Sequence, residues 1–311
     1  MPINGALALS SWRDGQAKQD ILKFVEDVCN ENSEFFVPEP DRIAVFDNDG
    51  TLWVEKPLMT QIEFIRDQIR PENDVEPEQE SKHSLFDKIK DAFEDSVVDL
   101  LNDLKNLSEE LLDGVTTDEY KAQVSKWIAK TRHPRYQRLY TELVYQPMME
   151  VLQLFMQNNI QCYIVSGGST DFVRPWCEDV YNIPTQNIIG SSLRTRVVEK
   201  DGELALEYLP VPFYFDNGDA KVRSIGRLIG KQPIAAFGNS HGDAEMLRWV
   251  GRAKRHIAYL IHHTDAVREY QYSPDPKFLL GKGTLELAKQ YDWCVVDMKN
   301  DWATIFSFEN D

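Results

Sequence analysis

The sequence predicts an α/β fold in which a parallel sheet is accompanied by a separate helical insert. Short apolar segments at 42–46, 161–165 and 233–237 read as strands, and each is followed by a polar turn that contains glycine. Apolar residues at helical spacing separate these strands, a pattern typical of parallel sheets with right-handed crossovers. Since the carboxyl ends of parallel strands lie at one edge of the sheet, we expect the three turns to meet there.

The first half of the chain contains one expected strand and several expected helices. An amphipathic helix is predicted around residues 21–28, before the buried strand at 42–46. Residues 58–145 show no strand pattern, and we interpret them as the helical insert. Apolar residues recur there every three or four positions in three stretches, at 58–69, 86–111 and 120–128.

The second half returns to alternating strands and helices. The predicted strand at 161–165 is followed by a helix that ends near Tyr181, and residues 193–215 alternate around Asp201-Gly202 as in a β-hairpin. A helix near 220–228, the strand at 233–237 and a last strand at 293–297 complete the pattern. We therefore assign residues 1–57 and 146–311 to the α/β core.

The composition is that of an acidic globular protein. The chain has 34 Lys+Arg and 51 Asp+Glu, for a formal net charge of −17. Such a charge disfavours binding to nucleic acids and to anionic membranes. Residues 71–119 hold 16 of the acidic residues and 4 of the basic ones, so much of the charge belongs to the insert. The oligomeric state cannot be read from the sequence.

The cysteines and the first residues bear on localisation. Cys29, Cys162, Cys177 and Cys294 have no zinc-site spacing, and we expect free thiols, as in a reducing compartment. No segment is apolar for the ~18 residues of a membrane span, and residues 1–9 lack the pattern of an intact signal peptide. We expect a cytoplasmic protein, with a periplasmic or secreted location as the alternative if a signal has been removed.

The turns carry residues suited to phosphate chemistry. Asp47 and Asp49 are two apart beyond a strand, and their oxygens suit Mg²⁺ or nucleophilic attack on phosphorus. Ser166-Gly167-Gly168 offers a hydroxyl and backbone N–H groups near a helix N-terminus, which favours an anion. Lys221 could neutralise phosphoryl oxygens. Taken singly, each feature is also explained by an ordinary turn or a surface lysine.

The order of these motifs resembles that of the haloacid dehalogenase superfamily, in its phosphoserine-phosphatase-like branch. Residues 43–52, Ile-Ala-Val-Phe-Asp-Asn-Asp-Gly-Thr-Leu, match the first motif position by position. Ser166 matches the second motif, Lys221 the third and residues 238–243 the fourth. The resemblance implies a Rossmann-like core with a mobile cap, and it makes the insert at 58–145 the helical cap domain.

The resemblance also implies a Mg²⁺-dependent phosphatase that acts on a small phosphorylated metabolite. Asp47 would be the nucleophile that forms an aspartyl-phosphate, and Asp49 the general acid and base. Ser166, the Gly167 amide and Lys221 would hold the phosphoryl oxygens. The metal residues would be Asp47, the Asp49 carbonyl, Asp243 and Asn239, which stands where the family often has Asp. An Asp at position 49 argues against dehalogenases and transport ATPases of the superfamily.

Two alternatives to hydrolysis remain open at this point. A phosphotransferase of the same fold would pass the phosphoryl group to an alcohol. The second alternative is a non-catalytic phosphate-binding or regulatory protein, and the presence of Asn239 in the fourth motif is the observation that supports it.

One basic cluster lies at the end of the insert. Arg132, Arg135 and Arg138 are interpreted either as a solvated junction or as substrate-binding residues that face the crevice.

Overall fold

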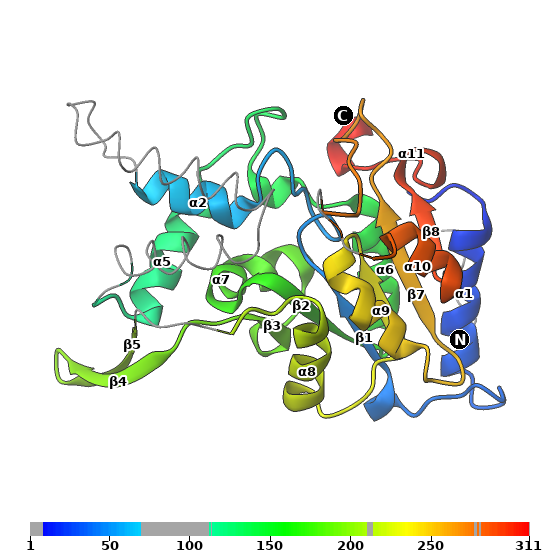
Figure 1. Cartoon of the computed structure of the whole chain (residues 1–311), viewed down its shortest axis with the longest axis horizontal. Coiled ribbons are helices and arrows are strands. Elements are labelled where there is room, and N and C mark those ends of the chain that lie inside the picture. The colour runs from blue at the N-terminus through cyan, green and yellow to red at the C-terminus, as the bar shows by residue number, and fades with distance from the viewer. Residues whose placement is uncertain are drawn as a thin grey trace.

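A six-stranded parallel sheet forms the centre of the protein (Figure 1). The computed structural model describes residues 9–69, 112, 114–209, 214–276, 279 and 281–310. The expected helix at 86–111 lies outside these residues. The strands of the sheet, in spatial order, are β3 Ile188–Ser191, β2 Gln161–Ser169, β1 Ile43–Phe46, β6 Ala235–Gly238, β7 Ile257–His262 and β8 Cys294–Asp297.

The strand order reverses direction at β1. The sheet runs from β1 outward through β2 to β3 on one side and through β6 and β7 to β8 on the other. This is the order of a Rossmann-like fold, in which the ligand crevice lies beyond the carboxyl ends of the strands on either side of the reversal. Ala44 pairs with Cys162 on β2 and with Ala235 on β6, so the turns after these three strands share one edge. The α/β fold expected from the sequence is confirmed.

Helices cover both faces of the sheet. Alternate residues of β1 divide between two apolar cores, with Ala44 and Phe46 in one and Ile43 and Val45 in the other. The first core is closed by α1 Gln16–Cys29, α6 Gln146–Gln157 and α7 Thr170–Tyr181. The second core is closed by α8 Asp219–Leu228, α9 Ala244–Val250 and α10 Thr284–Gln290. Because β1 is buried on both faces, it reads as a continuous apolar run.

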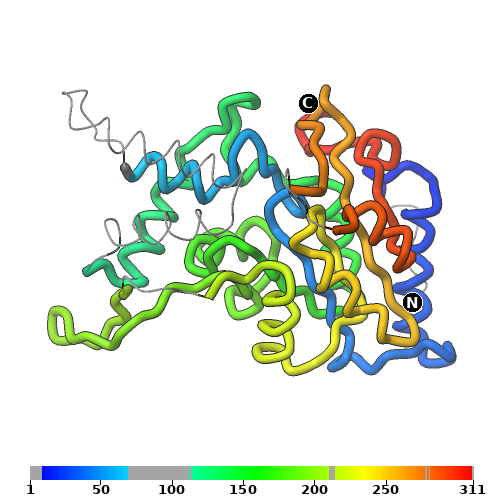
Figure 2. Tube along the Cα trace, viewed as in Figure 1, coloured from blue at the N-terminus to red at the C-terminus, as the bar shows by residue number. Residues whose placement is uncertain are grey.

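The segment that precedes α1 lies beside the segment that follows β8 (Figure 2). The Trp12 ring meets the Trp302 ring edge to face, with centroids 5.8 Å apart. The Arg13 N–H donates to the Asp301 carbonyl oxygen over 2.7 Å. Asp301 is the last residue of α11 Met298–Asp301, which follows β8. The segments before α1 and after β8 therefore stabilise each other.

The insert contributes two described helices, α2 Thr60–Ile69 and α5 Thr117–Ile128. A capping box fixes the start of α5, because the Thr116 side chain accepts from the Glu119 N–H and the Glu119 side chain accepts from the Thr116 N–H. Figure 1 shows α2, α5 and the β4–β5 hairpin together on the left of the sheet.

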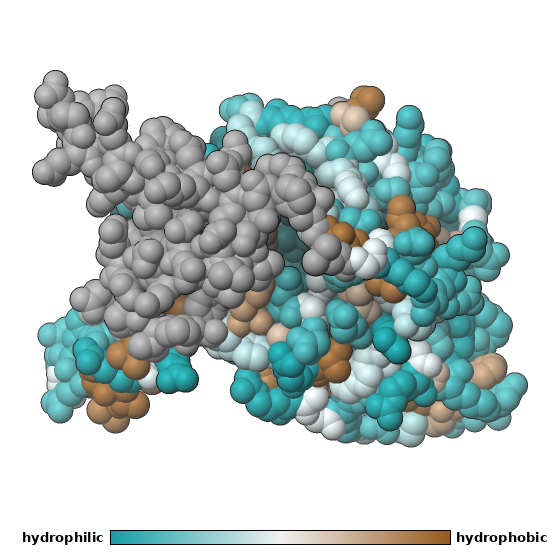
Figure 3. All heavy atoms as spheres, viewed as in Figure 1, coloured by the Kyte–Doolittle hydropathy of each residue, from teal (hydrophilic) through white to brown (hydrophobic). Residues whose placement is uncertain are grey.

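The hairpin packs on the insert and not on the central sheet. It consists of β4 Thr195–Lys200 and β5 Glu203–Tyr208, paired around Asp201-Gly202 as expected. The Tyr208 N–H donates to the Val115 carbonyl oxygen over 3.0 Å, next to α5. Hydrophobic atoms gather on this projection in Figure 3, where Val197, Leu204 and Leu206 are exposed. The hairpin lies in a segment that we assigned to the core, yet its contacts include the insert.

Several elements were not anticipated. Strands β3 and β7 and helices α6, α9 and α10 had no separate expectation. Short 3₁₀ helices occur at Glu39–Asp41, Tyr140–Glu142, Thr185–Asn187, His241–Asp243 and Ser307–Asn310. All four cysteines are free, two of them buried and two half-buried. Among the helices that the structure describes, none combines the length and the apolar character needed to cross a membrane.

Candidate active site

Asp47 lies directly beyond β1, where the strand order reverses. Its backbone N–H donates to the Phe237 carbonyl oxygen of β6 over 2.9 Å, which ties the turn to the neighbouring strand. The side chain is buried. Burial and the nearby Asp243 carboxylate raise the pKa of Asp47 well above its usual range. The position needs a cation to stay ionised.

Lys221, in the first turn of α8, supplies that cation. Its Nζ lies 2.5 Å from Asp47 Oδ1 and 2.7 Å from Asp243 Oδ1, and it donates to the Val165 carbonyl oxygen over 2.8 Å. Burial lowers the pKa of Lys221, but the carboxylates of Asp243 and Asp47 raise it further, to above its ordinary value. The ammonium stays charged, and it joins the turns after β1 and β6 to Val165 of β2.

Asp49 has a different environment from Asp47. Its Oδ1 accepts from the Trp53 Nε1–H over 3.0 Å. Burial and the Glu55 carboxylate raise the pKa of Asp49 to about 6. Such a carboxyl group can hold a proton near neutral pH and release it again, which is what general acid–base catalysis requires.

Gly50 allows the chain to turn sharply just after Asp49, where it packs against the side chain of Asn239. Its φ of +75° favours glycine, and a Cβ here would overlap with the side chains of Asn239 and Glu55. The Asn239 Oδ1 accepts from Thr51 Oγ1 over 3.2 Å, and its Nδ2 donates to Glu55 Oε2 over 2.9 Å. The first and fourth turns are thus held in contact by Asn239.

The expected turn at Ser166 is the irregular last part of β2, where the pairing register with β3 shifts between Ser166 and Ser169. We call residues 166–169 the glycine loop. Ser166 Oγ accepts from the Gly168 N–H over 3.0 Å, and Ser191 Oγ donates to the Gly167 carbonyl oxygen over 2.7 Å. Gln61 of α2 reaches this loop from the insert, and its Oε1 accepts from the Ser169 N–H over 2.7 Å. The insert is thereby joined to the expected anion-binding turn.

Asp243 is fully buried and fixes the turn after β6. Its Oδ2 accepts from the backbone N–H groups of Asn239 and Ser240 over 3.1 and 3.0 Å. A Cβ at Gly242 would overlap with the side chain of Asn217, which precedes α8. The fourth turn therefore packs closely against the segment that carries Lys221.

A cavity of about 480 Å³ opens beside these turns. Asp47, Asp49, Lys221 and Asn239 line it together with Gly167, while Ser166, the buried neighbour of Gly167, is not among the lining residues. The four stretches singled out in the sequence meet at one edge of the sheet, around one buried ammonium group.

The family follows from this arrangement and from the sequence together. Residues 44–248 match the profile of the haloacid dehalogenase-like hydrolase family. The chain belongs to this family.

The chain is also similar to several solved structures. A conserved protein of unknown function from Anaerococcus prevotii is 16% identical, with a TM-score of 0.50 over 80% of this chain and 86% of that one. A protein of unknown function from Bordetella pertussis is 14% identical, with a TM-score of 0.52 over 83% and 98% of the two chains. A phosphoserine phosphohydrolase-like protein from Francisella tularensis is 18% identical, with a TM-score of 0.41 over 70% and 87%. None of the curated proteins matches the chain.

The arginine cluster lies elsewhere in this hydrolase. None of Arg132, Arg135 and Arg138 lines the cavity beside Asp47. Arg132 donates to the Gln137 carbonyl oxygen, and Arg135 donates to the carbonyl oxygens of Ala266, Val267 and Glu269. The Arg138 guanidinium lies 4.2 Å from the Phe308 ring centroid. The interpretation of these arginines as substrate-binding residues that face the crevice therefore differs from what the structure shows. Their side chains are bound instead by neighbouring backbone carbonyl oxygens and aromatic rings.

Three residues near the site were missed in the sequence. Glu55 bonds to Asn239, Gln61 bonds to the Ser166 turn, and His263 Nε2 donates to the Gly50 carbonyl oxygen over 2.7 Å. Glu55 and Gln61 follow the first motif closely, which was a usable signal. Nothing in the local sequence around His263 indicates its contact with Gly50.

The donor atoms at the site fit a hard divalent cation. The carboxylates of Asp47 and Asp243 share the single ammonium of Lys221, and the Asp49 carboxylate lies near enough to act on Asp47, which leaves an excess of carboxylates. Within the described part of the chain, no three Asp, Glu, His or Cys side chains form a ligand group by themselves. A ligand set for Mg²⁺ would therefore include a backbone or amide oxygen, as from Asp49 or Asn239.

Proposed function

We propose that the protein is a Mg²⁺-dependent phosphatase that hydrolyses a small phosphate monoester. The observation that carries this proposal is the Lys221 ammonium, which contacts Asp47 and Asp243 at the cavity beside the glycine loop. A nucleophilic carboxylate, a cation and a backbone N–H such as that of Gly167 are the parts that phosphoryl transfer needs, because the reaction depends mainly on positioning and charge stabilisation.

In the first step, a carboxylate oxygen of Asp47 attacks phosphorus. A bond forms between that oxygen and phosphorus while the bond from phosphorus to the leaving alcohol breaks. Asp49 gives its proton to the alcohol oxygen, and its pKa of about 6 means that it can carry this proton near neutral pH. The products of this step are the free alcohol and the phosphoryl group on Asp47.

In the second step, water attacks the same phosphorus atom. Asp49, now ionised, takes a proton from the water, and the bond between phosphorus and Asp47 breaks. Inorganic phosphate leaves, and both carboxyl groups return to their starting states. Ser166, the Gly167 N–H and Lys221 hold the phosphoryl oxygens in both steps.

Mg²⁺ would be held by Asp47, the Asp49 carbonyl oxygen and Asp243, with Asn239 beside them. It supplies positive charge where an anionic nucleophile approaches an anionic ester. We also propose that residues 58–145 act as the cap of this site, since Met59 and Ile62 line the cavity and Gln61 bonds to the Ser166 loop.

The test is hydrolysis of p-nitrophenyl phosphate with Mg²⁺. We expect turnover that EDTA abolishes and that Asp47→Asn lowers by about 10³-fold or more, because the nucleophile is lost. The control is Asp41→Asn, an exposed carboxylate paired with Lys231, which should keep the wild-type rate. Unchanged turnover in Asp47→Asn would refute the role of Asp47. Equal release of phosphate and alcohol in the presence of an added acceptor alcohol would separate hydrolysis from phosphotransfer.

A further inference from the structure

The cavity beside Asp47 has two chemically different ends. At the sheet edge it is lined by carboxylates, Lys221 and the glycine loop. At the insert and the hairpin it is lined by apolar and aromatic side chains. The residues of this second wall, which we call the distal wall, are Met59, Ile62, Ile65, Tyr120, Leu193 and Tyr208.

The aromatic rings of the distal wall are fixed in place. The Tyr120 ring meets the Phe64 ring edge to face with centroids 5.6 Å apart, and it meets the Tyr208 ring in the same way at 5.7 Å. The Tyr208 hydroxyl donates to Asp171 Oδ2 over 2.8 Å. Because this hydroxyl already has a partner, Tyr208 presents mainly its ring to the cavity.

The distal wall carries no charge. Among the described residues that line the cavity, the one cation is Lys221, and it already contacts Asp47 and Asp243. The lining carboxylates, Asp47, Asp49 and Glu55, all belong to the polar end. A carboxylate, an ammonium group or a second phosphate on the leaving alcohol would meet no charged partner among the described residues of the distal wall, and burying an unpaired charge is costly.

We propose, on the basis of the phosphatase activity proposed above, that the substrates are phosphate monoesters of uncharged, largely apolar alcohols. The phosphoryl group lies at Asp47 and Lys221, and the carbon skeleton of the alcohol packs on the distal wall. Gln68 and Gln123 line the same cavity and can accept a neutral hydroxyl or amide of the alcohol by hydrogen bonding.

A matched pair of esters tests this inference. Benzyl phosphate and 4-carboxybenzyl phosphate have similar leaving alcohols and differ by one carboxylate. We expect kcat/KM to favour benzyl phosphate by about 30-fold or more, since the additional carboxylate is left unpaired. The Ile65→Arg variant places a cation at the distal wall and should reduce this ratio by about tenfold. Its control is Leu228→Arg, an exposed position on α8 that is 58% accessible and outside the cavity, which should keep the wild-type ratio.

The outcomes separate the two proposals. A wild-type ratio at or below one, with both esters hydrolysed, overturns the substrate class and leaves the phosphatase activity standing. An absence of turnover with both esters and with p-nitrophenyl phosphate overturns the phosphatase activity, and this inference with it. If Ile65→Arg does not fold, the kcat/KM ratio of the wild-type protein for the two esters still decides whether the substrate class is correct.

Discussion

Lys221 supplies the positive charge that compensates the two buried carboxylates Asp47 and Asp243. It is 2% exposed, and its ammonium group is shared between two carboxylates from the turns after β1 and β6. A buried ion pair contributes little net stability compared with an apolar replacement of all its members, but removal of one member leaves the others without compensation. The role of Lys221 should therefore be visible in stability as well as in catalysis.

We predict that Lys221→Met lowers the free energy of unfolding by about 3 kcal/mol, because Asp47 and Asp243 lose their common partner. Urea denaturation at pH 7.5 in the presence of EDTA measures this change. The matched control is Lys231→Met, which removes an exposed pair with Asp41 and should cost about 1 kcal/mol or less. Equal losses in the two variants would contradict the role assigned to Lys221.

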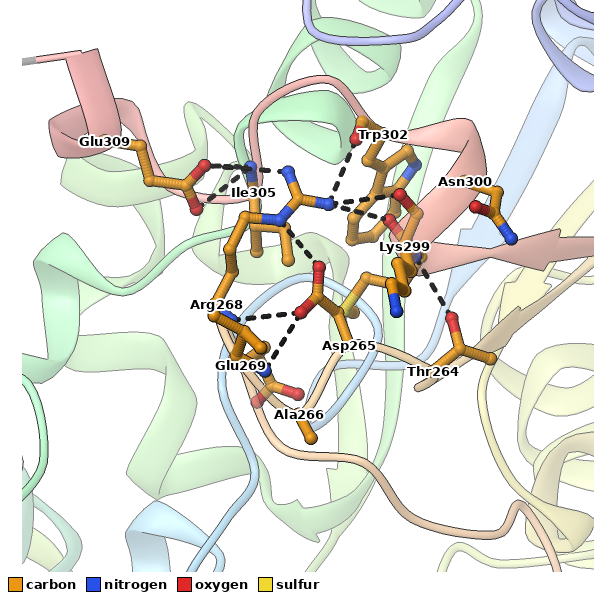
Figure 4. A network of polar contacts seen from close by, with 12 residues as sticks. Thr264, Asp265, Ala266, Arg268, Glu269, Lys299, Asn300, Trp302, Ile305 and Glu309 are labelled. Atoms are coloured by element: carbon orange, nitrogen blue, oxygen red, sulfur yellow. Dashed lines mark hydrogen bonds and ion pairs between the residues drawn. The ribbon is translucent and has the colours of Figure 1, made fainter.

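At the scale of elements, the loop after β7 holds the C-terminal segment through Arg268 (Figure 4). Arg268 Nε donates to Asp265 Oδ2 over 2.7 Å, and its two terminal nitrogens donate to the carbonyl oxygens of Ala303 and Trp302 over 3.0 and 3.2 Å. The planar fork of a guanidinium group can serve several acceptors at once, which an ammonium group cannot do in the same geometry.

We predict that Arg268→Met lowers the free energy of unfolding by about 2 kcal/mol, and that Arg268→Lys recovers only part of it, because the carbonyl oxygens lose their donors. Hydrogen exchange should accelerate at the amides of Ala303 and Ile305 in both variants. Arg223→Met serves as the control, since its pair with Asp219 is exposed and should contribute about 0.5 kcal/mol or less. Unaltered exchange at Ala303 and Ile305 would exclude this function of Arg268.

At the scale of the whole molecule, the excess of carboxylates at the site would link the proposed Mg²⁺ binding to stability. Because a ligand that binds only the folded state stabilises it, Mg²⁺ at about 100 times its Kd should add about 2.7 kcal/mol. We expect Mg²⁺ to raise Tm, EDTA to reverse the rise, and Asp47→Asn to reduce it, while Asp41→Asn keeps it. Differential scanning calorimetry provides the measurement. A Tm that is insensitive to Mg²⁺ would argue against a metal site at Asp47.

The sequence was informative about the fold and the motif turns for a physical reason. In a parallel sheet all strand ends lie on one edge, so the order of strands and turns is enough to bring Asp47, Lys221 and Asp243 together. The contacts of Arg132, Arg135 and Arg138 could not be predicted from the order of strands in this way. Arg135 is bound by the carbonyl oxygens of residues 266, 267 and 269, and no local pattern around position 135 indicates these distant partners.

The contact between the insert and the site was similarly inaccessible to sequence reasoning. Helical spacing predicted α2, but it did not indicate that Gln61 would bond to the Ser169 N–H. The hairpin was predicted from its alternation and its Asp201-Gly202 turn, whereas its packing on α5 depends on the tertiary path of the chain. Local patterns specify elements, and contacts between distant elements depend on how those elements are arranged.

The pairing of β1 has a consequence for synthesis on the ribosome. The neighbouring strands β2 and β6 begin at Gln161 and Ala235. Both edges of β1 can therefore be paired only after more than half of the chain has been synthesised. Trp12, near the start of the described chain, packs against Trp302 near its end. An α/β domain of this kind exposes apolar surface while it emerges, since non-local pairing is slow. The edge of β1 that pairs with β6 therefore stays unpaired until residues 235–238 have been synthesised.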